Sequence, residues 1–237
     1  LDPGDGHVLW KTIRPSEAVQ ESREAFNTPI VFDNKGQKEL IVAGGDALTG
    51  HDLNTGKELW RWATWNPMKI GHWRLVTSPA AGDGIILASA PKGDPIYAIK
   101  AGGKGDISAS GLAWKSEPKS PLTTDVPTPL FYQGDFFVLS DVRKSLSRVE
   151  PKTAKIKWTV PMPGRSKFEA SPTGADGKIY CLNFAGDVVV LDATKGTVLL
   201  NTPMGDSGDD MTRSCIAAVQ GQLFIRTNAK LFCVGKK

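Results

Sequence analysis

A short phrase that links an acidic residue to a tryptophan eight positions later recurs along this chain of 237 residues and restricts its fold. The clearest copy is Asp52-Leu-Asn-Thr-Gly-Lys-Glu-Leu-Trp60. Other copies span residues 2–10, 150–158 and 192–200, the last with Leu200 in the tryptophan position, and a looser copy ends at Trp114. Repetition at this period predicts an array of small stacked units rather than one conventional core.

A second marker, a Ser-Pro or Thr-Pro pair, recurs out of phase with the phrase at intervals of 43 to 50 residues. The pairs begin at Thr28, Ser78, Thr128 and Ser171, and Ser214-Cys215 takes the fifth position. A short apolar stretch, a turn that contains glycine and a second apolar run follow each pair, which is the pattern of a β-hairpin. With a third run and the tryptophan phrase, each unit is a four-stranded antiparallel meander of about 40–50 residues, the size of a propeller blade.

The tryptophan phrase has a physical rationale. Glycine tolerates positive φ in the turn between strands three and four, and the acidic side chain accepts hydrogen bonds from the amides of that turn. The indole ring then lies across the junction with the next blade, where its burial contributes on the order of 3 kcal/mol. We therefore expect structural docking roles for four residues: Trp10, Trp60, Trp114 and Trp158.

Composition excludes several classes of function. No apolar run reaches the roughly 20 residues of a membrane-spanning helix, so no transmembrane segment is expected. The 29 basic and 25 acidic residues are interspersed, which argues against a nucleic-acid partner. Cys181, Cys215 and Cys233 lie in apolar runs and are expected to be buried free thiols. No metal site is predicted, because the chain has no cysteine and histidine cluster and residues 206–210 lack the pattern of a defined calcium loop.

The repeats resemble the tryptophan-docking repeats of the pyrroloquinoline quinone-type β-propellers, a family that also includes an outer-membrane assembly lipoprotein. The resemblance covers nearly the whole chain, and residues 221–235 are similar to the last blade of secreted bacterial members that hold no cofactor. It implies an all-β propeller of four-stranded antiparallel blades joined by tryptophan docking. It also implies an extracytoplasmic location, periplasmic or secreted.

Five repeats are visible, and they predict a single propeller domain over residues 1–237. Residues 1–12 carry a fourth-strand phrase, whereas residues 213–235 contain only three strands. We therefore expect the N-terminal strand to complete the last blade, because pairing the two ends protects open sheet edges. A complete chain would close with five blades, and a truncated one would be the later part of a seven- or eight-bladed propeller.

Candidate binding residues lie in the loops that join a fourth strand to the next first strand. Such loops emerge on one face of a propeller, and loops on a rigid scaffold often carry function. The residues expected to contact a partner there are Glu24, Trp62, Trp65, His72, Trp73, Arg74, Lys167, Glu169, Asp209 and Asp210. No catalytic residue is predicted, because the chain has no nucleophile motif and no phosphate-binding glycine loop.

These observations favour a non-catalytic extracytoplasmic scaffold that binds a protein or glycan partner through its loop face and needs no cofactor. The first alternative is a quinoprotein oxidoreductase that uses pyrroloquinoline quinone and calcium. Family members with that activity carry adjacent cysteines, a tryptophan that stacks on the cofactor and a Glu/Asn/Asp calcium set, and this chain has no adjacent cysteines. The second alternative, a five-bladed carbohydrate-active enzyme, requires two facing carboxylates.

Overall fold

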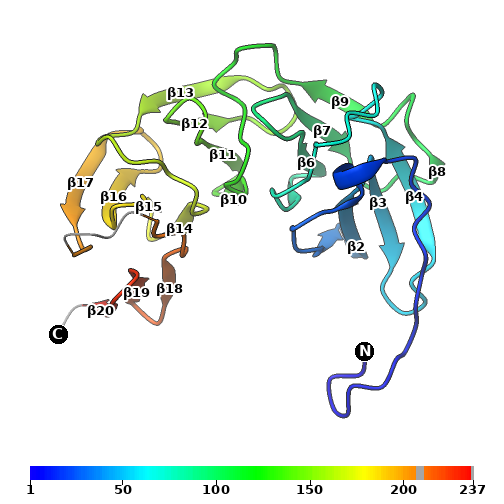
Figure 1. Ribbon diagram of the computed structural model, residues 1–237, viewed down its shortest axis with the longest axis horizontal. Coiled ribbons are helices and arrows are strands. Elements are labelled where there is room, and N and C mark those ends of the chain that lie inside the picture. The colour runs from blue at the N-terminus through cyan, green and yellow to red at the C-terminus, as the bar shows by residue number, and fades with distance from the viewer. Residues whose placement is uncertain (207–210, 236–237) are drawn as a thin grey trace.

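The computed structural model describes residues 1–206 and 211–235. Within them, the only helical element is the 3₁₀ turn η1 (Gln20–Arg23), and the strands form five sheets arranged along an open arc (Figure 1). The chain therefore has the β-propeller fold. No helix among these residues has the length and apolar character needed to cross a membrane.

Four of the sheets are complete antiparallel meanders, called blades 1 to 4 below. Blade 1 contains β1 (Ile30–Asn34), β2 (Gln37–Gly44), β3 (Ala47–Asp52) and β4 (Glu58–Ala63). Blade 2 contains β5 (Ala80–Gly82), β6 (Ile85–Ser89), β7 (Ile96–Lys100) and β9 (Leu112–Lys115). Blade 3 contains β10 (Leu130–Tyr132), β11 (Asp135–Ser140), β12 (Ser145–Val149) and β13 (Ile156–Pro161). Blade 4 contains β14 (Thr173–Ala175), β15 (Lys178–Leu182), β16 (Asp187–Asp192) and β17 (Val198–Pro203).

Two elements depart from the four-stranded pattern. The terminal sheet has three strands, β18 (Ala217–Val219), β19 (Gln222–Arg226) and β20 (Leu231–Gly235). The short strand β8 (Gly105–Asp106), from the long connection between β7 and β9, pairs in parallel with Trp60 and Arg61 of β4. Blade 2 thus reaches back to blade 1 through backbone pairing as well as through side chains.

The core lies between the blades, and the two-residue period of the middle strands explains why. In β15, Ile179 and Cys181 belong to the apolar cluster shared with blade 3, whereas Tyr180 and Leu182 belong to the cluster shared with the terminal sheet. Successive side chains of a strand point to opposite faces, so an uninterrupted apolar run fills both junctions at once. This is how short strands bury a blade on two sides.

The Ser-Pro and Thr-Pro pairs form a hydrogen-bonded series at the start of the inner strands. The amide of Thr28 donates to Ser78 Oγ (2.9 Å), that of Ser78 to Thr128 Oγ1 (3.1 Å) and that of Thr128 to Ser171 Oγ (2.9 Å). Each bond crosses a junction, and the separations of 50, 50 and 43 residues equal the repeat lengths. The hydroxyl of each pair therefore ties its blade to the preceding one.

Three tryptophans bridge neighbouring units through the indole N–H. Trp10 donates to the carbonyl oxygen of Leu53 (3.0 Å), and Trp114 donates to that of Pro151 (2.7 Å). Trp158 donates to the carbonyl oxygen of Thr194 (3.0 Å). Each acceptor lies in the turn between strands three and four of the next blade, so each ring is held by packing and by a hydrogen bond.

Trp60 departs from the expected docking geometry. It is fully buried, and its indole N–H donates to Glu39 Oε2 of its own blade at 2.6 Å. The ring lies so close to Gly50 that a side chain there would overlap it. The reason is the long β7–β9 connection, whose β8 pairs beside β4, so that no compact turn presents a carbonyl to this ring.

The expected pairing of residues 1–12 with the last sheet is not formed. These residues contain no strand, and Trp10 and Thr12 are attached to blade 1, where Thr12 Oγ1 donates to the carbonyl oxygen of Gly56 (2.8 Å). Figure 1 shows the N-terminal segment and the terminal sheet at opposite ends of the arc. The number of blades in a closed ring stays a prediction.

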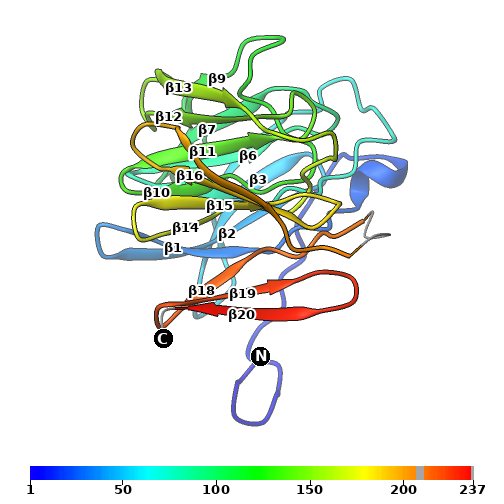
Figure 2. The ribbon, with the colours of Figure 1, turned by 90° about the vertical axis from the view of Figure 1, so that its left-hand side faces the viewer.

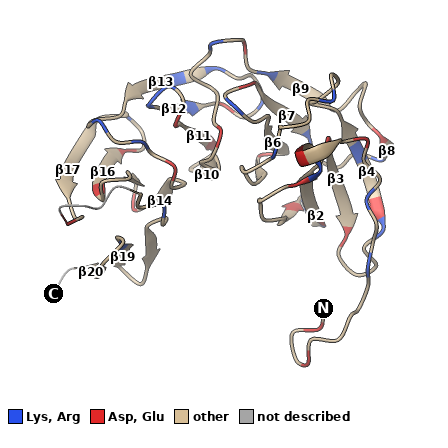
Figure 3. Ribbon diagram, viewed as in Figure 1, with Lys and Arg blue, Asp and Glu red and all other residues tan. Residues whose placement is uncertain are grey.

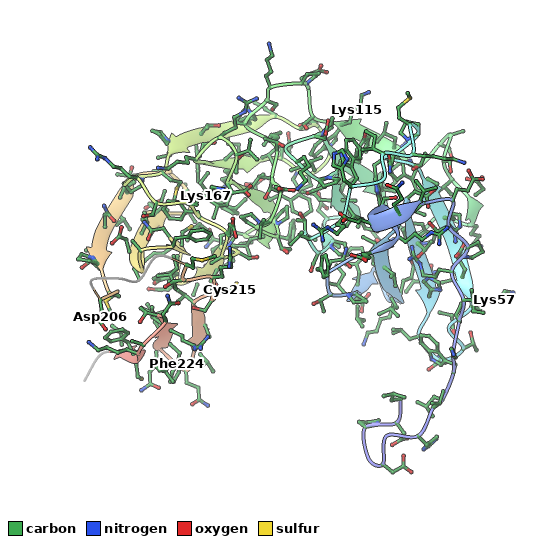
Figure 4. All side chains as sticks on the ribbon, viewed as in Figure 1. Lys57, Lys115, Lys167, Asp206, Cys215 and Phe224 are labelled. Carbon is green, nitrogen blue, oxygen red and sulfur yellow. The ribbon has the colours of Figure 1, made fainter. Side chains whose placement is uncertain are left out.

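The three cysteines differ in burial, and all are free thiols. Cys181 is buried between blades 3 and 4, and desolvation raises its thiol pKa to about 12. Cys215 and Cys233 are exposed, so the expectation of burial is wrong for these two. Cys215 precedes β18 (Figure 4) and Cys233 lies in β20, so both belong to the terminal sheet region, which has blade 4 on one side and no described blade on the other.

Candidate partner-binding face

The loops that follow the fourth strands gather on one side of the blades, together with η1 (Figure 2). Around blade 1, two of these loops are tied together by backbone bonds. The amide of Ser22 donates to the carbonyl oxygen of Gly71 (2.8 Å), and that of Phe26 donates to the carbonyl oxygen of Leu75 (2.7 Å). The loops before β1 and before β5 therefore form one rigid platform.

Arg74, in the loop before β5, contacts two residues of the loop before β1. Its Nε lies 3.3 Å from Glu21 Oε2, and its guanidinium carbon lies 5.9 Å from the ring centroid of Phe26. Phe26 is 62% exposed; Glu24, two residues before Phe26, and His72, two residues before Arg74, are also exposed. We call Glu21, Glu24, Phe26, His72 and Arg74 the first-blade cluster; it combines an oriented cation, two carboxylates and an accessible ring.

Trp62 and Trp65 are not part of this surface, contrary to the sequence-based expectation. They are 4% and 2% exposed, lie 6.0 Å apart between ring centroids and belong to the core of blades 1 and 2. Trp65 also donates to the carbonyl oxygen of Gly45 at 3.2 Å. Trp73 is half-buried and packs against the same core. A partner therefore cannot reach the first two rings, whereas part of Trp73 stays accessible.

A second cluster lies on the loops of blade 4 and repeats the same chemistry. Arg213 Nε lies 2.8 Å from Glu169 Oε2, and its guanidinium carbon lies 4.9 Å from the ring centroid of Phe184. Lys167 is exposed on the loop before β14 (Figure 4), and its carbonyl oxygen accepts the amide of Phe184 at 2.9 Å. We call Lys167, Glu169, Phe184 and Arg213 the fourth-blade cluster. Asp209 and Asp210 lie outside the described residues.

Sequence reasoning missed Phe26, Phe184 and the role of Arg213. In both clusters an arginine pairs with a glutamate and lies over a phenylalanine, and residues far apart in the sequence contribute: two loops in the first-blade cluster and three in the fourth-blade cluster. No local motif signals such a triad, because it exists only after the loops are brought together. The alternation along β4 was an available signal for Trp62, which has the same parity as the buried Trp60.

Three aspartates lie on connections of blades 2 and 3: Asp94 in the β6–β7 loop, Asp125 between β9 and β10, and Asp141 in the β11–β12 loop. Asp125 Oδ1 accepts the amide of Lys92 (2.6 Å), and Asp141 Oδ1 accepts the amide of Asp125 (2.9 Å). Burial raises the pKa of Asp141, and the charge of Asp125 raises it further. Burial also raises the pKa of Asp94. Basic and acidic residues are interspersed along the arc (Figure 3).

The tryptophans and cysteines can be compared with the features that the resemblance to quinoprotein dehydrogenases would require. All seven tryptophans pack within or between blades or against a blade core, and no two cysteines are adjacent. In the described part of the chain, the one group of side chains with metal-ligand spacing is Asp2, Asp5 and His7, on the surface of the N-terminal turn.

Comparison with known proteins agrees with this architecture. Residues 51–237 match the family model for outer membrane protein assembly factor BamB. The fold is similar to that of BamB from Moraxella catarrhalis (TM-score 0.64, 11% identity, 97% of this chain and 62% of that one). It is similar to quinohemoprotein alcohol dehydrogenase from Comamonas testosteroni (TM-score 0.67, 15% identity, 92% of this chain and 42% of that one). It is also similar to the computationally designed protein Ika8 (TM-score 0.64, 12% identity, 87% and 57%).

The search of curated proteins returned no match. The structural likenesses, all at low identity, show the fold alone, and the chain spans less than two thirds of each of these three solved proteins. The family model, in contrast, matches more than half of the chain. The chain therefore belongs to the family of the outer membrane protein assembly factor BamB, among the propellers with pyrroloquinoline quinone-type repeats.

Proposed function

We propose that this protein is an extracytoplasmic scaffold that binds a protein partner through its loop face, without a catalytic role or a cofactor of its own. The family name, an assembly factor for outer membrane proteins, supports a place in the cell envelope and a protein as the partner. The loop face supports the proposal because it presents two arginine–glutamate–phenylalanine clusters on a rigid frame.

The exposed ring of Phe26 beside Arg74 is the observation that carries the proposal. Aromatic and arginine side chains dominate the energy of protein interfaces, because they bury large areas and make directed polar contacts. Burial of the Phe26 ring contributes up to about 2 kcal/mol, and the stacked guanidinium is already oriented before binding. The ion pair with Glu21 favours this position of Arg74, and both side chains stay about half exposed and open to a partner.

Site-specific photo-crosslinking tests the proposal in the cells that make the protein. A photoreactive residue replaces Phe26 in one variant and Lys195, an exposed residue of the β16–β17 turn at the other end of the blades, in the control. The expected result is a discrete adduct with an envelope protein from position 26 and none from position 195. The partner is then purified, and its affinity is measured for Arg74→Glu and for Lys195→Glu.

We expect Arg74→Glu to weaken binding by at least about tenfold and Lys195→Glu to leave it within about twofold. Equal losses in the two variants would remove the loop face from the interface. If the protein bound to a glycan array and gave no protein adduct, the partner would be a glycan and not a protein. Reduction of a dye with alcohols after addition of pyrroloquinoline quinone and calcium would show that the protein is an enzyme.

A further inference from the structure

Aromatic rings from blade 3 fill its junctions with both neighbours at the end of the blades opposite the loop face. The ring of Tyr132 packs against Gly174 of blade 4, and its hydroxyl accepts the amide of Gly177 at 2.8 Å. On the other side, the ring of Phe131 packs against Gly82 of blade 2. Both rings come from the last residues of a first strand, just before the hairpin turn.

The next junction has small residues at the same positions. Ala175 precedes the turn of blade 4 as Tyr132 precedes that of blade 3, and Ala218 occupies the position of Phe131 in the terminal sheet. The result is a cleft of about 860 Å³ between blade 4 and the terminal sheet. Tyr180 and Leu223 are among its lining residues, and both belong to the apolar interface of these two sheets.

The cleft also offers the polar group that holds the ring in the filled junction. Gly221 occupies the position of Gly177 and has a similar conformation, with φ of +74° against +69°. In the filled junction the amide of Gly177 donates to a phenol oxygen. Among the residues that the structure describes, no side chain accepts a hydrogen bond from the amide of Gly221. The donor is therefore available at the cleft.

We infer that this cleft binds an aromatic side chain, tyrosine in preference to phenylalanine, carried by an extended segment of a protein partner. The cleft continues the apolar interface between blade 4 and the terminal sheet, and the preceding junction shows which group completes such an interface. Because Ala218 carries a methyl group where blade 4 has Gly174, the ring lies shallower than Tyr132 does. The volume leaves room for the residues that flank it.

The polypeptide nature of the ligand follows from the strand beside the cleft. Val234 and Gly235 of β20 line the cleft, and β20 pairs with β19 alone among the described strands. Its free edge presents backbone donors and acceptors that one part of an extended segment can pair with, while a residue further along the segment places its ring in the cleft. This site is at the opposite end of the blades from η1 (Figure 2), so the inference does not rest on the loop-face proposal.

The test uses the full chain and three acetylated pentapeptide amides, Thr-Val-Tyr-Val-Thr and its versions with Phe or Ala in the centre. Titration calorimetry or ligand-observed NMR measures their affinity. We expect the Tyr peptide to bind several-fold more tightly than the Phe peptide and the Ala peptide to show no saturable binding. Equal affinities for the Tyr and Ala peptides would overturn the inference.

A variant that fills the cleft from within supplies the specific control. Ala175→Tyr copies the ring of Tyr132, and we expect it to weaken binding of the Tyr peptide at least tenfold and to raise the melting temperature. Ala109→Tyr, at an exposed position in the β8–β9 connection, is the matched control and keeps full affinity. Undiminished binding by Ala175→Tyr would place the peptide elsewhere and overturn the inference.

Two further measurements keep the test decisive. If the circular dichroism of Ala175→Tyr shows unfolding, Ala218→Phe, which copies Phe131, takes its place with the same expected loss of affinity. Light scattering of the free protein checks self-association. A dimer that Ala218→Phe dissociates would show that a second copy fills the cleft, which overturns the assignment to another protein.

Discussion

The indole N–H of Trp158 in blade 3 donates to the carbonyl oxygen of Thr194 in blade 4, 3.0 Å away. The centroid of the Trp158 ring lies 5.8 Å from that of the Phe137 ring, and the indole packs against Gly196. A side chain at position 196 would displace the indole. Leu200 holds the corresponding place in blade 4, where its side chain is 50% exposed. Equivalent positions of the repeat therefore differ in how much of the junction they stabilise.

Trp158→Ala is expected to lower the free energy of unfolding by about 3 kcal/mol, because it removes ring contacts and one hydrogen bond across a junction. Leu200→Ala is the matched comparison, with an expected loss below about 1 kcal/mol at its half-exposed site. Urea denaturation followed by far-ultraviolet circular dichroism measures both. Equal losses would show that the indole does not hold the two blades together.

Gly50→Ala tests the different environment of Trp60. The added methyl group meets the buried indole directly, so we expect a loss of about 2–3 kcal/mol from overpacking. Gly134→Ala is the control, because its methyl group would meet no atom within 4 Å and its positive φ alone costs about 1 kcal/mol. Thermal unfolding of the two variants ranks them. A smaller loss for Gly50→Ala would mean that the Trp60 ring can move aside.

Two aspartates are expected to give opposite pH dependence. Burial raises the pKa of Asp141 in the folded state, so its contribution to stability falls as pH rises from about 4, the unfolded value. Hydrogen bonds from Thr55 lower the pKa of Asp52, so its contribution is present at neutral pH and is lost as pH falls below about 4. Asp141→Asn and Asp52→Asn each remove the contribution of one carboxyl group to the pH dependence of stability.

Melting temperatures of the wild type, Asp141→Asn and Asp52→Asn between pH 3 and 8 measure these slopes. Relative to the wild type, Asp141→Asn becomes more stable as pH rises, and Asp52→Asn becomes less stable over the acidic-to-neutral range. Parallel curves for all three proteins would contradict the stated environments of the two carboxyl groups.

Thiol labelling separates the three cysteines. The native protein is expected to react at Cys215 and Cys233, which are exposed, whereas Cys181 reacts only after denaturation because it is buried and its pKa is raised to about 12. Ellman's reagent counts the thiols, and the Cys215→Ser/Cys233→Ser variant provides the control. Rapid labelling of that double variant in the native state would show that the junction between blades 3 and 4 opens.

The sequence predicted the meander of each blade because turn residues and apolar runs follow one another in the same order in every repeat. Asp52, for example, accepts the amides of Asn54 and Thr55 in the turn that the phrase predicts. The docking partner of Trp60 was not predictable in this way. It depends on the long β7–β9 connection, which pairs with β4. Glu39 then accepts the hydrogen bond from the indole N–H of Trp60.

The binding face was predictable only in outline. Loops after the fourth strands do hold Arg74, Lys167 and other exposed charged residues, as expected from the order of strands. Their neighbours were not predictable, because Phe26 and Arg74 meet only after two loops separated by a whole blade are joined by backbone bonds. Their assignment to the loop after a fourth strand also suggested surface positions for Trp62 and Trp65, whereas Trp62 lies in β4 and both rings fill the space between blades 1 and 2.

The inner series from Thr28 to Ser171 has a direction, since each amide donates to a hydroxyl supplied by the unit that follows it along the chain. The three junctions among blades 1 to 4 thus use the same donor and the same acceptor type. At this series of bonds, a unit inserted or removed between two of these blades would meet the same donor on one side and the same acceptor on the other.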